Sequence, residues 1–496
     1  MATGLDDRDA SGGGGAPSAN PAPTLWIEVE DLFHYVRHNS RPSGIQRLSV
    51  ELYAALLAIP AAAGRVRFVR FSGDGIVPAD WAEVRALFDG LGADAASGPP
   101  RDGSASPDRA GRGGGRKPLA RRLAGAVQHR LPPEAAQPFH RFRVLQGAAL
   151  RSLRDVGRRE EKQITAGLVP PAMPPISGPA VSGIAAFGRP GDWLLSLGAS
   201  WHRTDYGRLL FSARRRGLRT AMLFYDLIPL RRPEWCHHTL VDGFNTWLDG
   251  VLPELDAVLS ISDFTGADMR ALFRERGMPD RPVRTLPLGT GFAVGAAAPG
   301  ADEPLPDRAL PPAGSYVLVV STIEARKNHL LMFQVWRRLQ EELPPDRLPT
   351  LVFAGRIGWL VSDLMEQIAA TNYLDGRLLI VEDPSDEALI RLYGGCLFTV
   401  MPSLFEGWGL PVSESLSLGK PCLVADATAL PEAGGPLVRR FDPFVLDDAC
   451  RAVRALLDDR DELRRWEDQV KRDFRPVSWT ETAQTLLAAL EEHDRV

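Results

Sequence analysis

The sequence predicts an α/β protein built from two doubly wound domains. Short apolar runs that read as strands alternate with stretches of helical periodicity, and this repetition of strand and helix predicts parallel sheets. A Pro-rich stretch, residues 301–314, interrupts the alternation, and a chain of 496 residues is long enough for two or three domains. The expected strands are residues 24–29, 66–71, 193–197, 220–225, 257–261 and 283–287 before that stretch, and 316–320, 350–354, 378–381, 397–401 and 422–425 after it.

The composition divides the chain further. Residues 1–22 are rich in Gly, Ala, Pro, Ser and Asp and lack the apolar segment of a signal peptide, so we expect a flexible leader. A first domain is expected over residues 23–300, with a flexible insertion at about residues 92–191, where Gly, Pro, Ala, Ser and Arg dominate. The second domain is expected over residues 301–475. No stretch approaches the roughly 18 to 20 uninterrupted apolar residues of a membrane-spanning helix, so we expect a cytoplasmic protein.

Charge and cysteine content exclude several classes. The chain has 58 Lys and Arg against 62 Asp and Glu, so its net charge of -4 gives no reason to expect a nucleic-acid partner. Its four cysteines are widely spaced, which predicts neither a disulfide framework nor a metal cluster. No spacing of His, Asp and Cys fits a metal site, and no metal or other cofactor is expected.

A local excess of basic residues lies inside the expected insertion, at residues 116–122 and 141–159. The plainer interpretation is a solvated segment. The sharper one is a peripheral contact with an anionic membrane surface, where each basic side chain contributes on the order of 1 kcal/mol.

The most informative segment is residues 397–432, which reads as strand, loop, helix and strand. Pro411 suits the first turn of a helix, and Gly407 and Gly409 before it let the backbone approach a ligand closely. The free N–H groups of such a helix start favour an anion or a phosphorylated sugar. Glu406 in the loop and Glu414, expected in the first helical turn, can accept hydrogen bonds from the hydroxyls of one ligand. The alternative is that the two acids only favour a helix N-terminus.

This segment resembles the paired-glutamate motif of the retaining family-4 glycosyltransferases, which have the GT-B fold of two Rossmann-like domains facing across a cleft. The resemblance covers about residues 316–442, including a turn at residues 430–434 that is similar to a downstream Pro-Glu-Gly turn of the family. It implies that Glu406 lies against the donor sugar and that Glu414 binds the nucleotide ribose. The backbone of Gly407, Trp408, Gly409 and Leu410 would line the sugar.

The loop at residues 321–328 (STIEARKN) resembles the basic diphosphate-binding loop of the same family. Lys327 falls where the family lysine neutralises the leaving diphosphate. Thr322 stands where the family often has an arginine, whereas here Arg326 adjoins the lysine. A solvated helix cap is the alternative interpretation of the Lys-Asn pair.

The first half of the chain carries two weaker matches. Residues 41–47 (RPSGIQR) resemble the glycine loop after the first strand of GT-B enzymes, where Gly44 would let donor or acceptor pass close to the backbone; a plain strand-to-helix turn is the alternative. Residues 224–229 (FYDLIP) resemble a strand-end motif with a catalytic histidine followed by aspartate. Tyr225 replaces that histidine, whereas Asp226 is retained and joins Glu406 as a candidate catalytic residue. His202, His237 and His238 are near in sequence, and each alone is more typical of a structural or solvated histidine.

The resemblance therefore implies transfer of a hexosyl unit, with retention, from a nucleoside-diphosphate sugar to a glycan or lipid-linked acceptor. It favours a donor like GDP-mannose and a place in surface polysaccharide assembly. It also implies that the C-terminal helix, residues 476–496 with Trp479 near its start, crosses back to the first domain. Two rivals remain: a catalytically silent module that binds sugar nucleotides, and a GT-B epimerase or phosphorylase.

Overall fold

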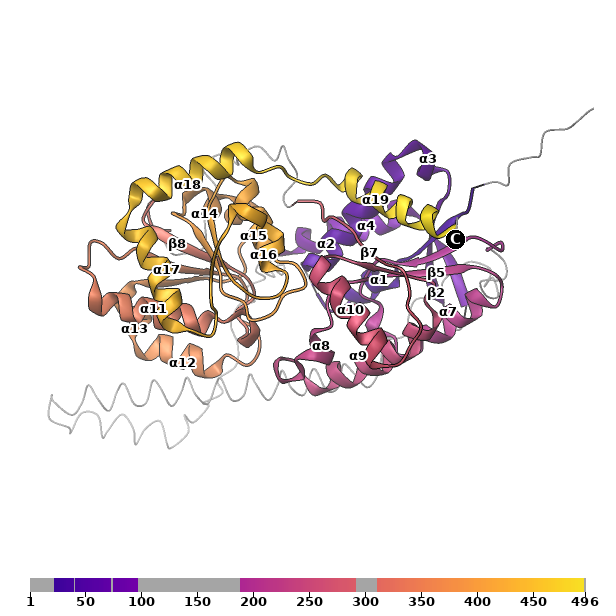
Figure 1. Ribbon diagram of the computed structural model, residues 1–496, viewed down its shortest axis with the longest axis horizontal. Coiled ribbons are helices and arrows are strands. Elements are labelled where there is room, and N and C mark those ends of the chain that lie inside the picture. The colour runs from indigo at the N-terminus through magenta and orange to yellow at the C-terminus, as the bar shows by residue number, and fades with distance from the viewer. Residues whose placement is uncertain (1–21, 40, 73–74, 97–187, 291–309, 495–496) are drawn as a thin grey trace, which may run out of the picture. The chain divides into compact units, whose positions relative to one another are not determined.

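The computed structural model describes residues 22–39, 41–72, 75–96, 188–290 and 310–494. The described strands form two sheets, one before and one after the Pro-rich stretch, which confirms the predicted α/β class with two doubly wound domains (Figure 1). Three long segments lie outside the described residues: residues 1–21 of the expected leader, residues 97–187 of the expected insertion with both basic segments, and residues 291–309, which include most of the Pro-rich stretch. No helix in the described part of the chain is both long and apolar enough to span a bilayer.

The first sheet has the strand order β3-β2-β1-β4-β5-β6-β7. The chain builds outward from β1 in one direction and then from β4 in the other, so the order reverses between these two central strands. Its strands are β1 (Leu25–Glu28), β2 (Val66–Ser72), β3 (Gly75–Ala79), β4 (Trp193–Ser196), β5 (Arg219–Phe224), β6 (Ala257–Ser260) and β7 (Val283–Thr285). Its helices are α1 (Glu30–Tyr35), α2 (Gly44–Ala58), α3 (Pro60–Ala63), α4 (Trp81–Ala96), α7 (Tyr206–Arg214), α8 (Ile228–Arg231), α9 (His238–Val251) and α10 (Asp263–Glu275), with short 3-10 turns η2 (Ser200–His202), η3 (Pro233–Trp235) and η4 (Leu252–Glu254).

One strand of this sheet departs from the prediction of parallel pairing. β3 runs antiparallel to β2 at the edge of the sheet, with Phe68 opposite Ala79 and Phe71 opposite Ile76. Pro78 lies inside β3, and proline within a sheet is confined to edges because it has no N–H to donate. The sequence did not predict this strand, since its five residues include Gly, Pro and Ala, which are all poor strand formers.

The second sheet has the strand order β10-β9-β8-β11-β12-β13, and all its pairs are parallel. Its order reverses between β8 and β11. The strands are β8 (Tyr316–Val320), β9 (Thr350–Ala354), β10 (Leu378–Val381), β11 (Thr399–Met401), β12 (Cys422–Ala425) and β13 (Arg439–Phe441). The helices that follow are α11 (His329–Glu342), α12 (Ser362–Ala370), α13 (Asn372–Gly376), α14 (Asp386–Gly395), α15 (Leu410–Ser417), α16 (Leu430–Gly434), α17 (Leu446–Asp458), α18 (Arg460–Asp473) and α19 (Trp479–Asp494), with 3-10 turns η5 (Ala325–Lys327) and η6 (Gly435–Leu437).

The core of the second domain forms where helices cover a sheet that is buried on both faces. All residues of β8 and β12 are buried, as expected for parallel strands with helices on each side. On α11 the predicted apolar stripe of Leu331, Val335 and Leu339 is buried. Trp336, fully buried beside it, donates its indole N–H to the Pro349 carbonyl at 2.8 Å.

The last helix of the chain packs against the first sheet's domain. Ala483, Leu486 and Leu490 of α19 are buried in the same core as α2, and α19 lies alongside α2 in Figure 1. The Thr482 hydroxyl donates to the Pro287 carbonyl at 2.6 Å, which fixes the start of the helix beside the end of β7. The first domain is therefore completed by residues from the far end of the chain.

We expect Leu486→Ala to destabilise the protein by about 2–5 kcal/mol, because it removes a fully buried side chain and leaves a cavity. Gln484→Ala, at an exposed position of the same helix, is the matched control. Thermal unfolding of both variants measures the effect. Equal melting temperatures would show that α19 does not contribute to this core.

Candidate functional site

The candidate site is formed by the loops that follow β8 and β11. These strands are neighbours in the sheet. The strands that follow β8 extend the sheet towards one edge, and those that follow β11 extend it towards the other. In doubly wound sheets, such a reversal opens a crevice at the carboxyl ends of the strands, and ligands bind there. The two loops are residues 321–328 and residues 402–409, which are the two segments that the sequence singles out.

Backbone contacts fix the first loop next to its two basic side chains. Ile323 bridges to Ile357, and its carbonyl accepts from the Gly358 N–H at 2.8 Å. The 3-10 turn η5 then carries Arg326 and Lys327. Asn328 follows in the left-handed conformation (φ 57°), which asparagine tolerates better than most residues, and α11 begins directly after it. The turn thus projects adjacent basic side chains from a fixed backbone.

The second loop docks on the first through the main chain. The Leu404 N–H donates to the Arg326 carbonyl at 2.9 Å, and the Glu406 N–H donates to the Thr428 hydroxyl at 2.8 Å. Gly409, with φ of 116°, ends the loop in a conformation that favours glycine, and α15 starts at Leu410 with Pro411 in its first turn. Trp408 donates its indole N–H to the Ser413 hydroxyl at 3.1 Å. The backbone is therefore fixed both before and after Glu406.

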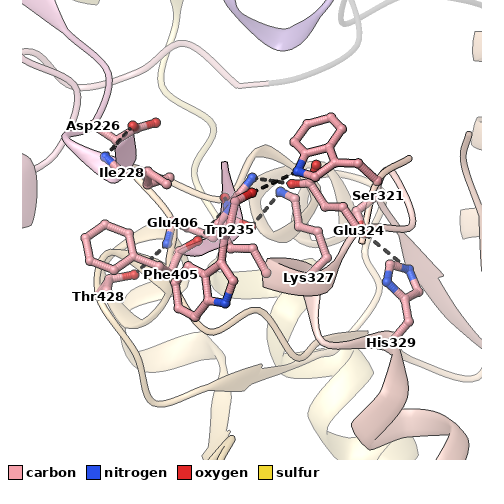
Figure 2. Close-up of polar contacts among 12 residues, drawn as sticks. Asp226, Ile228, Trp235, Ser321, Glu324, Lys327, His329, Phe405, Glu406 and Thr428 are labelled. Carbon is pink, nitrogen blue, oxygen red and sulfur yellow. Dashed lines mark hydrogen bonds and ion pairs between the residues drawn. The ribbon is translucent and has the colours of Figure 1, made fainter. Parts of the chain in front are cut away.

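Glu406 carries one cation on each carboxylate oxygen. Lys327 Nζ lies 2.6 Å from Oε1 (Figure 2), and Arg326 donates to Oε2 at 2.8 Å. Arg326 also donates to the Phe405 carbonyl at 2.6 Å and to Glu324 at 2.7 Å. Two acids and two bases thus form a charge-balanced and nearly buried cluster, in which the side chains of Arg326 and Lys327 are 15% exposed.

The pairing sets the protonation of the cluster. Burial alone would raise the pKa of Glu406, but Arg326 and Lys327 outweigh it and hold that pKa at about 2. Burial and the adjacent Arg326 lower the pKa of Lys327, although Glu406 and Glu324 act in the opposite direction and raise it. At neutral pH Glu406 is therefore an anion, and each of its two oxygens already contacts one of the two cations.

Glu414 belongs to a separate hydrogen-bond pair. Its Oε2 accepts from the Tyr393 hydroxyl at 2.9 Å, and burial raises the pKa of this carboxyl. Glu414 is the fifth residue of α15, which begins at Leu410, so it lies in the second turn and the prediction of the first turn is wrong. The reason is that Gly409 adopts a left-handed conformation, so the helix does not begin before Leu410.

The remaining predicted residues lie in the first domain. Gly44 is the first residue of α2, where the Ser43 hydroxyl caps the helix by accepting from Ile45. Asp226 follows β5, accepts from the Ile228 N–H at 2.9 Å (Figure 2), and has its pKa raised by burial. Tyr225 is buried, and its hydroxyl donates to the Leu197 carbonyl at 2.6 Å. The tyrosine side chain is thus part of the core.

The three histidines near Asp226 in sequence have local contacts of their own. His202 stacks on His34 with ring centroids 4.3 Å apart, and its Nδ1 lies 3.0 Å from the Ala199 carbonyl. His237 accepts from the Thr239 N–H as the N-cap of α9, and His238 is the first residue of that helix. Within the described residues, no three His, Cys, Asp or Glu side chains are arranged to hold a metal ion.

Three further residues support the cluster and were not predicted. Glu324 is 4% exposed and pairs with Arg326, although it lies inside the quoted loop. Thr428 holds the Glu406 N–H from the loop after β12, a contact that no local pattern reveals. His329 is buried behind Lys327, and burial together with Lys327 lowers its pKa to about 3, so it adds no third positive charge.

We expect Glu406→Gln to destabilise the protein at pH 7 by about 3 kcal/mol, because Arg326 and Lys327 lose their shared counterion. The folded pKa of Glu406 is about 2 against an ordinary 4.5, so its contribution is present above pH 4.5 and is lost as the pH falls towards 2. The stability difference between wild type and variant should therefore shrink over this interval. Urea unfolding at pH 7, 4 and 2.5 measures it.

Glu414→Gln is the matched control. The pKa of Glu414 is raised, so its ionised form opposes folding at pH 7, and an amide can still accept from Tyr393. This variant should be as stable as the wild type or more so. A Glu406→Gln variant with unchanged stability at pH 7 would contradict the buried ion pairs.

The second domain matches a known protein family. Residues 305–473 match the family model described as Glycosyl transferases group 1. The serotype-specific mannosyltransferase WbdA of Escherichia coli is 26% identical over 257 residues, which cover 50% of this chain and 31% of that protein. The O-antigen chain mannosyltransferase B of Escherichia coli is 27% identical over 242 residues, which cover 49% of this chain and 62% of that protein. The chain thus spans about a third to three fifths of the length of these relatives.

A solved structure matches along nearly the whole chain. The N-terminal domain of Candida albicans trehalose-6-phosphate phosphatase superposes with a TM-score of 0.55 at 13% identity, covering 97% of this chain and 98% of that one. At this identity the likeness concerns the fold alone. The chain has the two-domain GT-B fold, and its residues 305–473 form a domain of the glycosyl transferases group 1 family.

Proposed function

We propose that the protein is a retaining glycosyltransferase that moves a hexosyl unit from a nucleoside-diphosphate sugar to a glycan or lipid-linked acceptor hydroxyl. The observation that carries the proposal is the convergence of Arg326 and Lys327 on Glu406 where the strand order of the second sheet reverses. The names of the two relatives from Escherichia coli favour a mannosyl donor such as GDP-mannose and a place in surface polysaccharide assembly.

The cluster is suited to exchange one anion for another. In the described structure the Glu406 carboxylate neutralises both cations. A diphosphate has more charge and more acceptor oxygens than a carboxylate, so it would compete for Lys327 and Arg326. Exchange would release a Glu406 oxygen to accept hydrogen bonds from the donor sugar. Donor binding would therefore convert a structural ion pair into a pair of ligand contacts.

The same groups would lower the barrier to transfer. As the glycosidic bond breaks, negative charge grows on the departing diphosphate and positive charge on the sugar. Lys327, Arg326 and the N-terminal N–H groups of α15 would stabilise the first, and the Glu406 carboxylate would stabilise the second. Thr428, Leu404 and the turn at Asn328 already fix the backbones of both loops, so only the side chains would rearrange when the donor binds.

The other assignments complete the proposal. The backbone of Gly407, Trp408, Gly409 and Leu410 would lie beneath the sugar, and Glu414 would bind the ribose through the face not used by Tyr393. Gly44 would give donor or acceptor a close approach to the backbone. Asp226, whose pKa is raised by burial, is the proposed group on the acceptor side, and no metal or other cofactor is required.

One observation favours a second candidate, a module that binds sugar nucleotides without catalysis. Tyr225 stands where the resemblance implies a histidine, and it is only 6% exposed. Its hydroxyl donates a hydrogen bond to the Leu197 carbonyl and lies near the Ser49 hydroxyl. Burial raises the pKa of the Tyr225 hydroxyl well above its ordinary value, so it does not supply a proton carrier at neutral pH. The two candidates share donor binding and differ in turnover.

We expect a matching sugar nucleotide at 100 times its Kd to stabilise the wild type by about 2.7 kcal/mol, and Lys327→Ala to abolish most of this gain. Thermal unfolding with GDP, UDP, ADP and dTDP sugars identifies the donor. Lys471→Ala is the control, because this lysine pairs with Glu467 on the surface of α18.

Turnover then separates the candidates. A transferase releases nucleoside diphosphate with formation of a glycoside, and Glu406→Ala should lower that rate by at least a hundredfold. Binding without release would favour the silent module, whereas release without a glycoside would favour an epimerase or phosphorylase. Full activity in Glu406→Ala would refute the role given to Glu406.

A further inference from the structure

A second concentration of positive charge lies at the opposite edge of the second sheet. A cavity of about 680 Å³ opens at the amino ends of β8, β9 and β10, where Ser315, Thr350 and Leu378 contribute to its wall. The Glu406 cluster follows the carboxyl ends of β8 and β11, so the cavity is a separate site. The charged residues in its wall are Arg347, Arg377, Arg460 and Asp346.

The three arginines differ in how they are neutralised. Arg347 pairs with Asp458 at 2.9 Å. Arg377 donates to the neutral carbonyls of Leu348 at 2.9 Å and Pro345 at 2.5 Å. The Nη1 of Arg460 is buried and has no hydrogen-bond partner, and no described carboxylate lies within ion-pair distance of this side chain. Asp346 in the wall and Asp458, which pairs with Arg347, supply two negative charges against three arginines, so one positive charge is left over.

The position of Arg460 makes this arrangement unfavourable for the protein alone. It is the first residue of α18, and a helix start favours acids over cations because of the helix dipole. Asp459 already caps this helix by accepting from the Glu462 N–H at 2.8 Å, so Arg460 is not needed for capping. Burial and the nearby Arg347 lower the pKa of Arg460, as expected for a cation that faces another cation. An anion in the cavity would relieve all of these costs.

We propose that the cavity lined by Arg347, Arg377 and Arg460 binds a small phosphate-bearing molecule, at a site distinct from the donor site. Guanidinium groups bind phosphate oxygens through paired N–H donors, and three of them, from Arg347, Arg377 and Arg460, line this one cavity. A volume of about 680 Å³ exceeds that of inorganic phosphate and fits a ligand of sugar-phosphate size. The inference concerns these residues alone and does not depend on the proposed transferase activity.

The test measures binding of tripolyphosphate to the full chain by isothermal titration calorimetry, in a Lys327→Ala background that weakens phosphate binding at the donor edge. Arg460→Gln should weaken binding at least tenfold. Arg464→Gln, one turn further along α18 on the surface and paired with Asp461, should leave binding unchanged. Sodium chloride at matched ionic strength controls for unspecific screening.

Thermal unfolding distinguishes a ligand site from a structural arginine. Without tripolyphosphate, Arg460→Gln should unfold at the same temperature as its parent or higher, because the side chain it removes is unpaired. With tripolyphosphate, the parent should gain stability and the variant should not. Arg347→Gln provides a second variant with the same expected loss of binding. The proposal is overturned if the parent does not bind tripolyphosphate, or if Arg460→Gln binds it as tightly as Arg464→Gln.

Discussion

The ion pairs of Glu406 with Arg326 and Lys327 are the interaction on which the second domain's functional edge depends. Two loops that are about 80 residues apart in the chain meet there, because β8 and β11 are neighbours in the sheet. Removing one member would leave buried charge without a counterion, which costs far more than a surface pair contributes. The cluster therefore joins both loops, and under the proposed function it holds two cations for a more highly charged ligand.

Much of the fold could be predicted because parallel strands with buried faces read as apolar runs. β8 and β12, for example, are buried along their whole length, and the stripe on α11 follows the helical period. The sequence does not predict β3 or β13, for different reasons. Three of the five residues of β3 are Gly, Pro and Ala, which are poor strand formers, whereas Arg439 and Arg440 of β13 are charged and interrupt the apolar run.

The site could be predicted in part, since its two loops carry motifs that are visible in the sequence. What the sequence could not provide is which groups touch. That Arg326 reaches the same carboxylate as Lys327, and that Thr428 holds the Glu406 backbone, depends on contacts across many residues. The unpaired Arg460 is likewise invisible in sequence, where a Lys or Arg at a helix start looks like any solvated residue. Positive charge is therefore neutralised differently at the two ends of the strands. At the carboxyl ends Arg326 and Lys327 have counterions within the protein, whereas at the amino ends Arg460 has none among the described residues.

In the proposed function, a donor diphosphate takes the place of the Glu406 carboxylate on Arg326 and Lys327. A crystal structure of the full chain with its nucleoside-diphosphate sugar, or with the nucleoside diphosphate alone, tests it most directly. We expect phosphate oxygens within hydrogen-bond distance of Lys327 Nζ and the Arg326 guanidinium, with the 2.6 Å contact between Lys327 and Glu406 broken. A diphosphate bound elsewhere, with that contact intact, would contradict it.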